Sequence, residues 1–198
     1  MRSLPLSAQA GVPSRGAFAE CPPAPARPGP VSSGKVNEAF VILSAGLPAG
    51  DYPMPPQPVA LEQAGCEFVP RVFGIRAGQD LAVRNADPTL HNVHAGRVFN
   101  VSMPQRSPAI SLFFPRDGLA TVTCDVHPWM RAYAGVSTHP FFAVTGPDGA
   151  FALRGLPAGN FTLTAWHERM GRASVQVDLK ESQTARVEIS LDAATPGG

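Results

Sequence analysis

The chain has few charged residues. They make up 16% of its 198 residues, and the formal net charge is +1. This composition offers no electrostatic reason to expect binding to nucleic acid or to an anionic membrane surface. No apolar run is long enough to span a bilayer. Segments with helical periodicity are also scarce, whereas 22 prolines and 19 glycines separate short apolar stretches. Together these features predict an all-β protein of short strands and turns.

Motifs typical of hydrolases are missing as well. The sequence contains no His-x-x-Glu zinc motif, no Gly-x-Ser-x-Gly segment and no obvious catalytic pair of carboxylates. We therefore expect no catalytic residues, and we expect that the protein is not an enzyme.

The densest group of metal-binding side chains lies between Cys124 and Met130. Within seven residues this segment holds a thiolate donor, the imidazole of His127 and a thioether, and a second imidazole lies upstream at His91. Soft sulfur and imidazole nitrogen favour copper, and a weak axial thioether tunes its potential. Zinc seldom binds a thioether, and its structural sites usually contain more Cys or His ligands. The pattern predicts one type 1 copper ion that alternates between Cu(I) and Cu(II).

The segments around these side chains are typical of strands that end in loops. Residues 80–85 and 120–123 both alternate as strands, and Cys124 directly follows the second. Residues 113–123 are predicted to form a hairpin with its turn at an Asp-Gly pair. Pro128 ends extended pairing and forces a tight loop. Two loops at the same end of a sandwich can therefore converge on one ion.

In these motifs the chain resembles the cupredoxins. The Cys-x-x-His-Pro-aromatic-Met loop and the His-Asn-Val-His segment carry the resemblance, which covers residues 58–137. It implies a Greek-key β-sandwich with a mononuclear blue copper centre. It also implies that Asn92 ties the two ligand loops together near the thiolate. The metal ligands that it implies are His91, Cys124, His127 and Met130.

Two side chains compete with members of that ligand set. Positions three apart in an extended segment face opposite sides, so only one of His91 and His94 can readily point into the site. The cupredoxin pattern uses the first histidine, which favours His91. Met103 is an alternative to Met130 as the axial ligand, although a packed core methionine is the more common interpretation.

Residues 138–192 are predicted to form a second β module, followed by a tail at 193–198. Its Asp-Gly-x-Phe and Leu-Pro-x-Gly-x-Phe turns resemble the carboxypeptidase regulatory-like, transthyretin-type or Ig-like sandwich. The combination with a copper domain resembles proteins labelled methylamine-utilisation proteins. The module is short for an independent sandwich, and residues 36–50 are a candidate to complete it. Its strands are predicted at residues 141–145, 150–153, 161–166, 173–179 and 185–191.

The first 35 residues are predicted to be a flexible lead-in. Residues 1–35 contain seven prolines among Gly, Ser and Ala, a composition that cannot build a core. The Ala-x-Ala pattern at residues 8–10 suggests the remnant of an export signal, and a tail without such a role is an equally open interpretation.

Two cysteines remain once Cys124 is assigned to copper. Cys21 and Cys66 form a spare pair that permits a disulfide. In the proteins that the chain resembles, a cysteine recurs in the N-terminal segment and another in a Gly-Cys-x-Phe-x-Pro segment, which implies that they pair. Pairing and no pairing both remain open, because Cys21 lies in the lead-in. A disulfide would indicate an oxidising compartment such as the periplasm.

Two functions are compatible with these motifs. The preferred one is a periplasmic carrier of single electrons, with transient redox partners docking at the mostly apolar surface of His127, Pro128 and Trp129. The alternative is a structural or copper-delivery module of a cell-envelope assembly. His139 and His167 are expected to be structural rather than parts of a second metal site. Five histidines in total are too few for the extra ligands of a multicopper oxidase or nitrite reductase.

Overall fold

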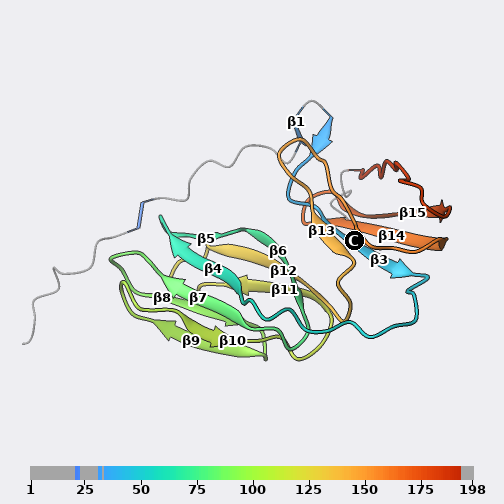
Figure 1. Ribbon diagram of the computed structural model, residues 1–198. Helices are drawn as coiled ribbons and strands as arrows, with labels where there is room; N and C mark the ends of the chain where they lie inside the picture. Colours follow the sequence, from blue (N-terminus) through green and yellow to red (C-terminus); the bar gives the residue numbers. More distant parts are fainter. Residues whose placement is uncertain (1–20, 23–30, 33, 193–198) are drawn as a thin grey trace, which may run out of the picture.

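The computed structural model describes residues 21–22, 31–32 and 34–192. This part of the chain contains strands and turns and no helix, which confirms the all-β prediction. It accordingly has no helix long and apolar enough to cross a membrane. Figure 1 shows a β-sandwich built from the middle of the sequence and a further sheet beside it. Most of the predicted lead-in, its export-signal remnant and the tail at 193–198 lie outside the described residues.

The sandwich consists of two sheets. The first has the order β10-β7-β4-β5 and contains β4 (Val59–Ala64), β5 (Glu67–Val69), β7 (Leu81–Asn85) and β10 (Ile110–Leu112). The second has the order β6-β12-β11-β8-β9 and contains β6 (Val72–Arg76), β8 (His91–Ala95), β9 (Phe99–Met103), β11 (Gly118–Thr123) and β12 (Arg131–Ser137). The β4–β7 and β6–β12 pairs are parallel, so neither sheet can form from hairpins alone.

The core of the sandwich follows from the alternation of its strands. In β7, Leu81 and Val83 are fully buried, whereas the next residue, Arg84, is exposed. Cys124 and Met130 belong to the same buried cluster, so two of the predicted ligands border the core. Other members of this cluster are Leu61, Phe68, Ile75, Val93, Val122 and Ala132.

The predicted hairpin over residues 113–123 does not form. β10 pairs with β7 in the first sheet, whereas β11 starts at Gly118 and pairs with β12 and β8 in the second. Residues 113–117 therefore cross from one sheet to the other. Phe114 in this crossover is 2% exposed and lies in the core. Burial of its ring favours the crossing over a hairpin, an effect that turn residues alone do not reveal.

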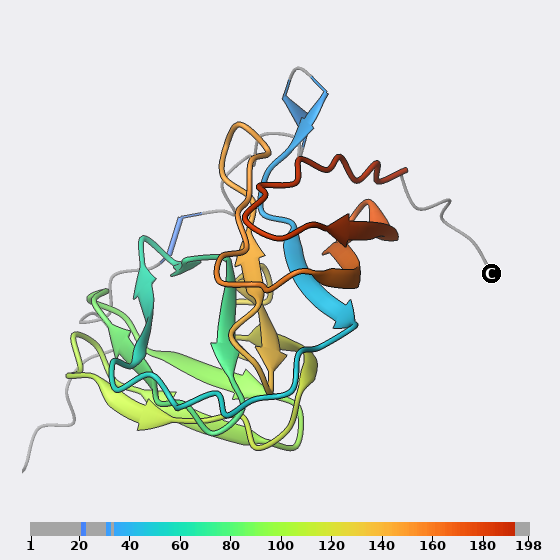
Figure 2. The same ribbon diagram turned by 45° about the vertical axis from the view of Figure 1, so that its right-hand side comes forward.

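The remaining large sheet combines a strand from before the sandwich with strands from after it. It has the order β13-β3-β14-β15, with β3 (Phe40–Ala45), β13 (Phe142–Val144), β14 (Gly159–His167) and β15 (Gly171–Leu179). Because β3 lies between β13 and β14, the sandwich is an insertion in the chain between β3 and β13. Figure 2 shows this C-terminal sheet beside the sandwich. A short pair, β1 (Val31–Ser32) and β2 (Lys35–Val36), precedes it.

Two strands predicted for the C-terminal module are absent from the described structure. Residues 150–153 and 185–191 form no ladder, although Phe151 and Val187 pack against the cluster that contains Phe161. Apolar alternation shows which side chains meet an apolar surface, whereas a strand also needs a backbone partner. The described part of the module is a single four-stranded sheet covered by irregular segments, where a transthyretin-type sandwich would have a second sheet.

The C-terminal sheet packs closely on the sandwich at two glycines. A Cβ atom at Gly135 in β12 would lie 2.3 Å from the ring of Phe40, and one at Gly74 in β6 would lie 2.3 Å from the ring of Phe142. Phe40 is 3% exposed, so its ring has little room to move. These two glycines thus allow the aromatic rings of β3 and β13 to lie directly on the backbone of the sandwich.

Arg71 adds a polar contact between the sandwich and the C-terminal sheet, which are the two bodies of the structure. Its guanidinium lies 3.0 Å from the carboxylate of Glu38, also pairs with Glu168, and lies over the ring of Tyr133 at 5.3 Å from the centroid. The Arg71 side chain is 10% exposed. Two carboxylates therefore balance a largely buried charge, which would be costly without partners.

Both histidines of the C-terminal region are buried, which favours their neutral form. The Nδ1 atom of His139 accepts the backbone N–H of Phe141, and that of His167 accepts the backbone N–H of Arg169. Burial is the main cause that lowers the pKa of each imidazole. Neither residue belongs to a group of three or more potential metal ligands in the described part of the chain. Their contacts are structural.

Gly135→Ala tests the contact between the bodies. The new methyl group would overlap the Phe40 ring, so we expect the free energy of unfolding to fall by about 1–3 kcal/mol. Chemical denaturation measures the change. Gly50→Ala is the matched control, because Gly50 is exposed and has open space around it. Equal stability of the two variants would show that the close packing at Gly135 is absent.

His167→Gln tests the effect of the buried imidazole on acid stability. The pKa of His167 is lower in the folded protein than in the unfolded chain, so the unfolded chain binds more protons as the pH falls below about 6.5. The contribution of the neutral His167 imidazole to the free energy of unfolding is therefore fully present above that pH. It is lost on acidification, by up to about 1.4 kcal/mol per pH unit for this one group. The variant should show a shallower decline of unfolding free energy between pH 7 and 5 in the metal-free protein. His94→Gln removes a group whose pKa is raised, and it should not flatten that decline.

Candidate metal centre

The four predicted copper ligands come from two adjacent strands of the second sheet. His91 is the first residue of β8, Cys124 follows the last residue of β11, and His127 and Met130 lie in the loop before β12. Because β8 and β11 are antiparallel neighbours, the start of one lies beside the loop that follows the other. Sequence-distant side chains thereby meet at one end of the sandwich.

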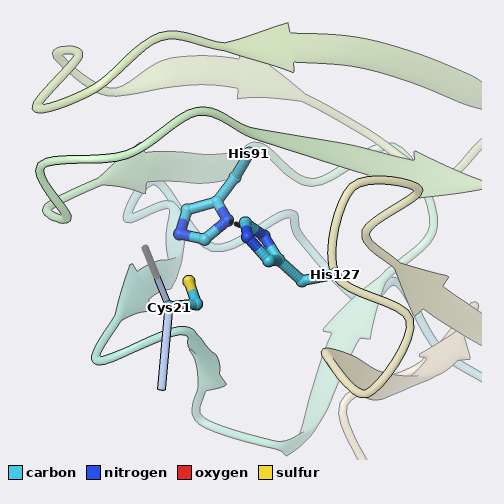
Figure 3. A group of neighbouring side chains, drawn as sticks. All are labelled: Cys21, His91 and His127. Carbon is cyan, nitrogen blue, oxygen red and sulfur yellow. Dashed lines mark hydrogen bonds between the residues drawn. The ribbon is translucent and has the colours of Figure 1, made fainter. Parts of the chain in front are cut away.

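Three donor atoms form a compact triangle there. The Nδ1 atoms of His91 and His127 are 2.9 Å apart, and Cys124 Sγ lies 3.9 Å from the first and 3.8 Å from the second. An ion bound at usual metal–ligand distances would hold its nitrogens about 3.3 Å apart and each nitrogen about 3.5 Å from the sulfur. The observed triangle differs from this by a few tenths of an ångström. Figure 3 shows the two imidazoles side by side, with a ring nitrogen of each directed at the other.

Met130 closes the ligand loop from the core side. Its backbone N–H donates to the His127 carbonyl at 2.9 Å, and its own carbonyl accepts the N–H of Cys124 at 3.3 Å. Its side chain is 1% exposed. The alternative axial candidate, Met103, is equally buried in the core cluster and lies opposite His91 in the β8–β9 ladder. The two internal hydrogen bonds of the loop limit how far its three ligands can move.

The charge state of Cys124 suits metal binding. Burial opposes the thiolate, but hydrogen bonds from His91 and from the backbone N–H groups of Asn92 and the loop outweigh it, so the pKa of the Cys124 thiol is lowered. The thiolate is the form that binds metals.

The two imidazoles differ in their electrostatic environment. Burial opposes the charged form of His91, but hydrogen bonds to Cys124 and Asp87 outweigh it and raise the pKa of His91. Burial, followed by repulsion from His91, lowers the pKa of His127. The thiolate sulfur and the two Nδ1 atoms nevertheless lie within 3.9 Å of one another. The donor set fits a soft cation at this position.

Asn92 ties the two ligand segments together. Its backbone N–H points at Cys124 Sγ at 3.5 Å. Its side-chain amide donates to Asp125 at 2.8 Å and to Asn100 at 2.8 Å, and its side-chain carbonyl accepts the N–H of Asp125. Asn92 itself is 7% exposed, whereas its partners Asn100 and Asp125 are exposed. Asn92 thereby connects β8 to the segment that begins at Cys124.

Asp87 orients His91, and the sequence did not identify it. Its carboxylate lies 2.9 Å from His91 Nε2 and also accepts the backbone N–H groups of Gly65 at 2.7 Å and Cys66 at 2.9 Å. A proton on Nε2 donated to Asp87 leaves Nδ1 free for a metal, as carboxylates commonly do for metal-binding histidines. The sequence feature that could have identified Asp87 is its position four residues before His91. The Asp-Pro pair there suggested only a turn.

His94 does not reach the donor triangle. Its Nδ1 lies 2.9 Å from the Asp125 carboxylate, and its Nε2 bonds to the Gly96 carbonyl at 3.0 Å. The ring is partly exposed on the other side of β8 from His91. The structure thus distinguishes the two histidines as the period of a strand requires.

Cys21 and Cys66 are joined by a disulfide with a Cα–Cα distance of 5.8 Å, and Cys124 remains free and buried. The bond lies next to the ligand loop. The indole N–H of Trp129 donates to the Cys66 carbonyl at 3.2 Å, and its ring lies 5.2 Å from that of His127. The turn that carries Cys66 therefore contacts both the ligand loop, through Trp129, and the carboxylate of Asp87.

Comparison with known proteins gives weak similarity. No family model and no curated protein matches the chain. Amicyanin from Paracoccus versutus is 20% identical, covers 49% of this chain and 97% of its own, and has a TM-score of 0.37. A purple cupredoxin from Nitrosopumilus maritimus is 20% identical over 40% of this chain and 99% of its own, with a TM-score of 0.35. A copper-containing nitrite reductase from Thermus scotoductus is 20% identical over 48% of this chain and 25% of its own, with a TM-score of 0.35.

Asn92→Ala tests the clamp between the ligand segments. We expect the affinity for copper to fall by about 10–100-fold, because loss of a group that orients metal ligands has effects of this size. Competition with a chelator of known affinity measures it. Asn160→Ala is the control, since Asn160 is an exposed asparagine of the C-terminal sheet. An unchanged affinity in Asn92→Ala would show that the β8–loop contacts do not hold the site together.

Proposed function

We propose that this chain binds one copper ion and carries single electrons between redox proteins. The proposed ligands are His91, Cys124, His127 and Met130. The observation that carries the proposal is the triangle of Cys124 Sγ and the two Nδ1 atoms, with no separation above 3.9 Å. We propose no enzymatic activity.

The chemistry of the donors supports copper. Two imidazoles, one thiolate and one thioether match the ligand set of blue-copper electron-transfer sites. When bound, copper supplies the one-electron change between Cu(I) and Cu(II). The residues of the chain hold the donors in nearly one arrangement: Asp87 holds His91, Asn92 holds the start of the loop, and two backbone hydrogen bonds close it. A site that barely rearranges favours rapid electron exchange.

Burial favours a carrier over a delivery protein. His91 is 0% exposed and Cys124 is 2% exposed, so water and competing thiols have little access to them. A protein that hands its metal to another needs labile, accessible ligands. The carrier is therefore the preferred function, and a structural or delivery module is the alternative that the experiment below would reveal.

The proposed partner surface surrounds His127. This imidazole is partly buried, Pro128 beside it is exposed, and Val126 is 48% exposed. Trp129 is partly buried behind them. A small, mostly apolar surface at the edge of a ligand suits the weak, short-lived complexes of electron-transfer proteins. We propose that redox partners dock there.

The disulfide supports an exported location. Structural disulfides persist in oxidising compartments such as the periplasm and are rare in the cytosol. We therefore propose that the protein works in the periplasm or a comparable compartment.

Visible and electron-paramagnetic-resonance spectra of the copper-loaded protein test the proposal. We expect strong blue absorption from the Cys124 thiolate, and a reversible one-electron wave in voltammetry with copper retained in both states. Cys124→Ser should abolish the blue colour, whereas His94→Gln should preserve it, because His94 bonds outside the donor triangle. A colourless copper complex, or loss of copper on each reduction, would refute the carrier.

A further inference from the structure

The Cys21–Cys66 disulfide lies directly against the two histidines of the metal centre. Cys21 Sγ, a ring nitrogen of His91 and a ring nitrogen of His127 all lie within 4.8 Å of one another. Figure 3 shows the Cys21 sulfur beside both imidazoles. Cys66 Sγ lies within the same limit of Asp87 and His91. A fifth and a sixth potential donor thus border the site, and both are bound up in a covalent bond.

The two halves of the bond are held very differently. Cys66 is 6% exposed and sits in the two-residue turn between β4 and β5 with φ at 61°, where its N–H donates to Asp87 and its carbonyl accepts from Trp129. Cys21 is only partly buried and packs against the core cluster. Reduction of the bond would leave Cys66 in place through its backbone. Cys21 would then be a thiol beside His91 and His127.

The distance that Cys21 would have to move is small. A sulfur and a nitrogen bound to the same tetrahedral ion lie about 3.5 Å apart. The Cys21 sulfur already lies within 4.8 Å of one ring nitrogen of each histidine, which exceeds that spacing by little more than about 1 Å. A thiolate tethered this close has a high effective concentration at the site.

We propose that the Cys21–Cys66 disulfide masks a second thiolate ligand, and that its reduction changes the centre from a His-His-Cys-Met set to a set of two cysteines and two histidines. In that state Cys21 would join Cys124, His91 and His127. Two thiolates and two imidazoles in a tetrahedron are the preferred ligands of Zn(II), whereas the masked set favours copper. This inference rests on the proposed function, because both ligand sets share Cys124, His91 and His127.

The chemistry of the switch is balanced with a dithiol as the reductant. The dithiol gives two electrons and two protons, the S–S bond breaks, Cys21 and Cys66 become thiols, and the reductant becomes a disulfide. Binding of the ion then releases to solvent the thiol proton of Cys21 and any proton on the donor atoms of Cys124, His91 and His127. In an oxidising compartment the bond stays closed and the centre keeps its copper ligands. In a reducing environment the same chain would bind Zn(II) tightly.

A matched pair of variants separates the ligand role of Cys21 from the loss of the disulfide. Cys66→Ser and Cys21→Ser both remove the bond, but only Cys66→Ser leaves the Cys21 thiol free. We expect Cys66→Ser to bind Zn(II) about tenfold or more tightly than Cys21→Ser, measured by chelator competition on the metal-free full-length proteins. The Co(II) form of Cys66→Ser should also show stronger thiolate-to-metal absorption. Equal affinities, or tighter binding by Cys21→Ser, would overturn the proposal.

Reduced wild-type protein gives a second measurement that does not depend on how the variants fold. After anaerobic reduction by a dithiol and its removal, Zn(II) should protect Cys21 and Cys124 from alkylation, while the reactivity of Cys66 stays as in the metal-free protein. Unchanged alkylation of Cys21 on addition of Zn(II) would refute the proposed ligand.

Failure of the switch and failure of the electron carrier are distinguishable. A blue, reversible wild-type protein whose two variants bind Zn(II) equally keeps the carrier and loses the switch. A wild-type protein without blue absorption, in which Cys66→Ser still binds Zn(II) more tightly than Cys21→Ser, keeps the masked ligand and loses the carrier.

Discussion

The hydrogen bonds of Asn92 to the Cys124–Asp125 segment are the contacts on which the candidate metal centre depends. One donor of the centre comes from β8, and the others come from the loop after β11. Asn92 contacts the loop at two points, through its backbone N–H to the Cys124 sulfur and its side chain to Asp125. The β8–β11 pairing and the contact between His94 and Asp125 add to this clamp.

A second chain of contacts links the centre to the first sheet. The turn between β4 and β5 donates two backbone N–H groups to Asp87, and Asp87 in turn orients His91. The same turn carries Cys66, so contacts run without a break from the disulfide to the Asp87 carboxylate and on to the His91 imidazole. The orientation of a single ring nitrogen therefore depends on three segments far apart in the sequence.

The packing between the two bodies follows a different principle. At Gly135 and Gly74 the absence of a side chain lets Phe40 and Phe142 lie on the sandwich backbone. Arg71 then joins the sandwich to the C-terminal sheet through the carboxylates of Glu38 and Glu168. Because β3 precedes the sandwich and β13 follows it, this contact holds both ends of the inserted domain against one sheet.

The sequence by itself determined the strand-rich architecture and predicted which side chains are the candidate donors, because alternation and short motifs are local properties. It did not show the crossing at residues 113–117 or the missing ladders at 150–153 and 185–191, because a strand needs a backbone partner that alternation does not report. The role of Asp87 and the place of Cys21 beside the histidines were decided only by tertiary structure. Both depend on distances between segments that are remote in the chain, and the spacing of residues along one segment carries no information about them.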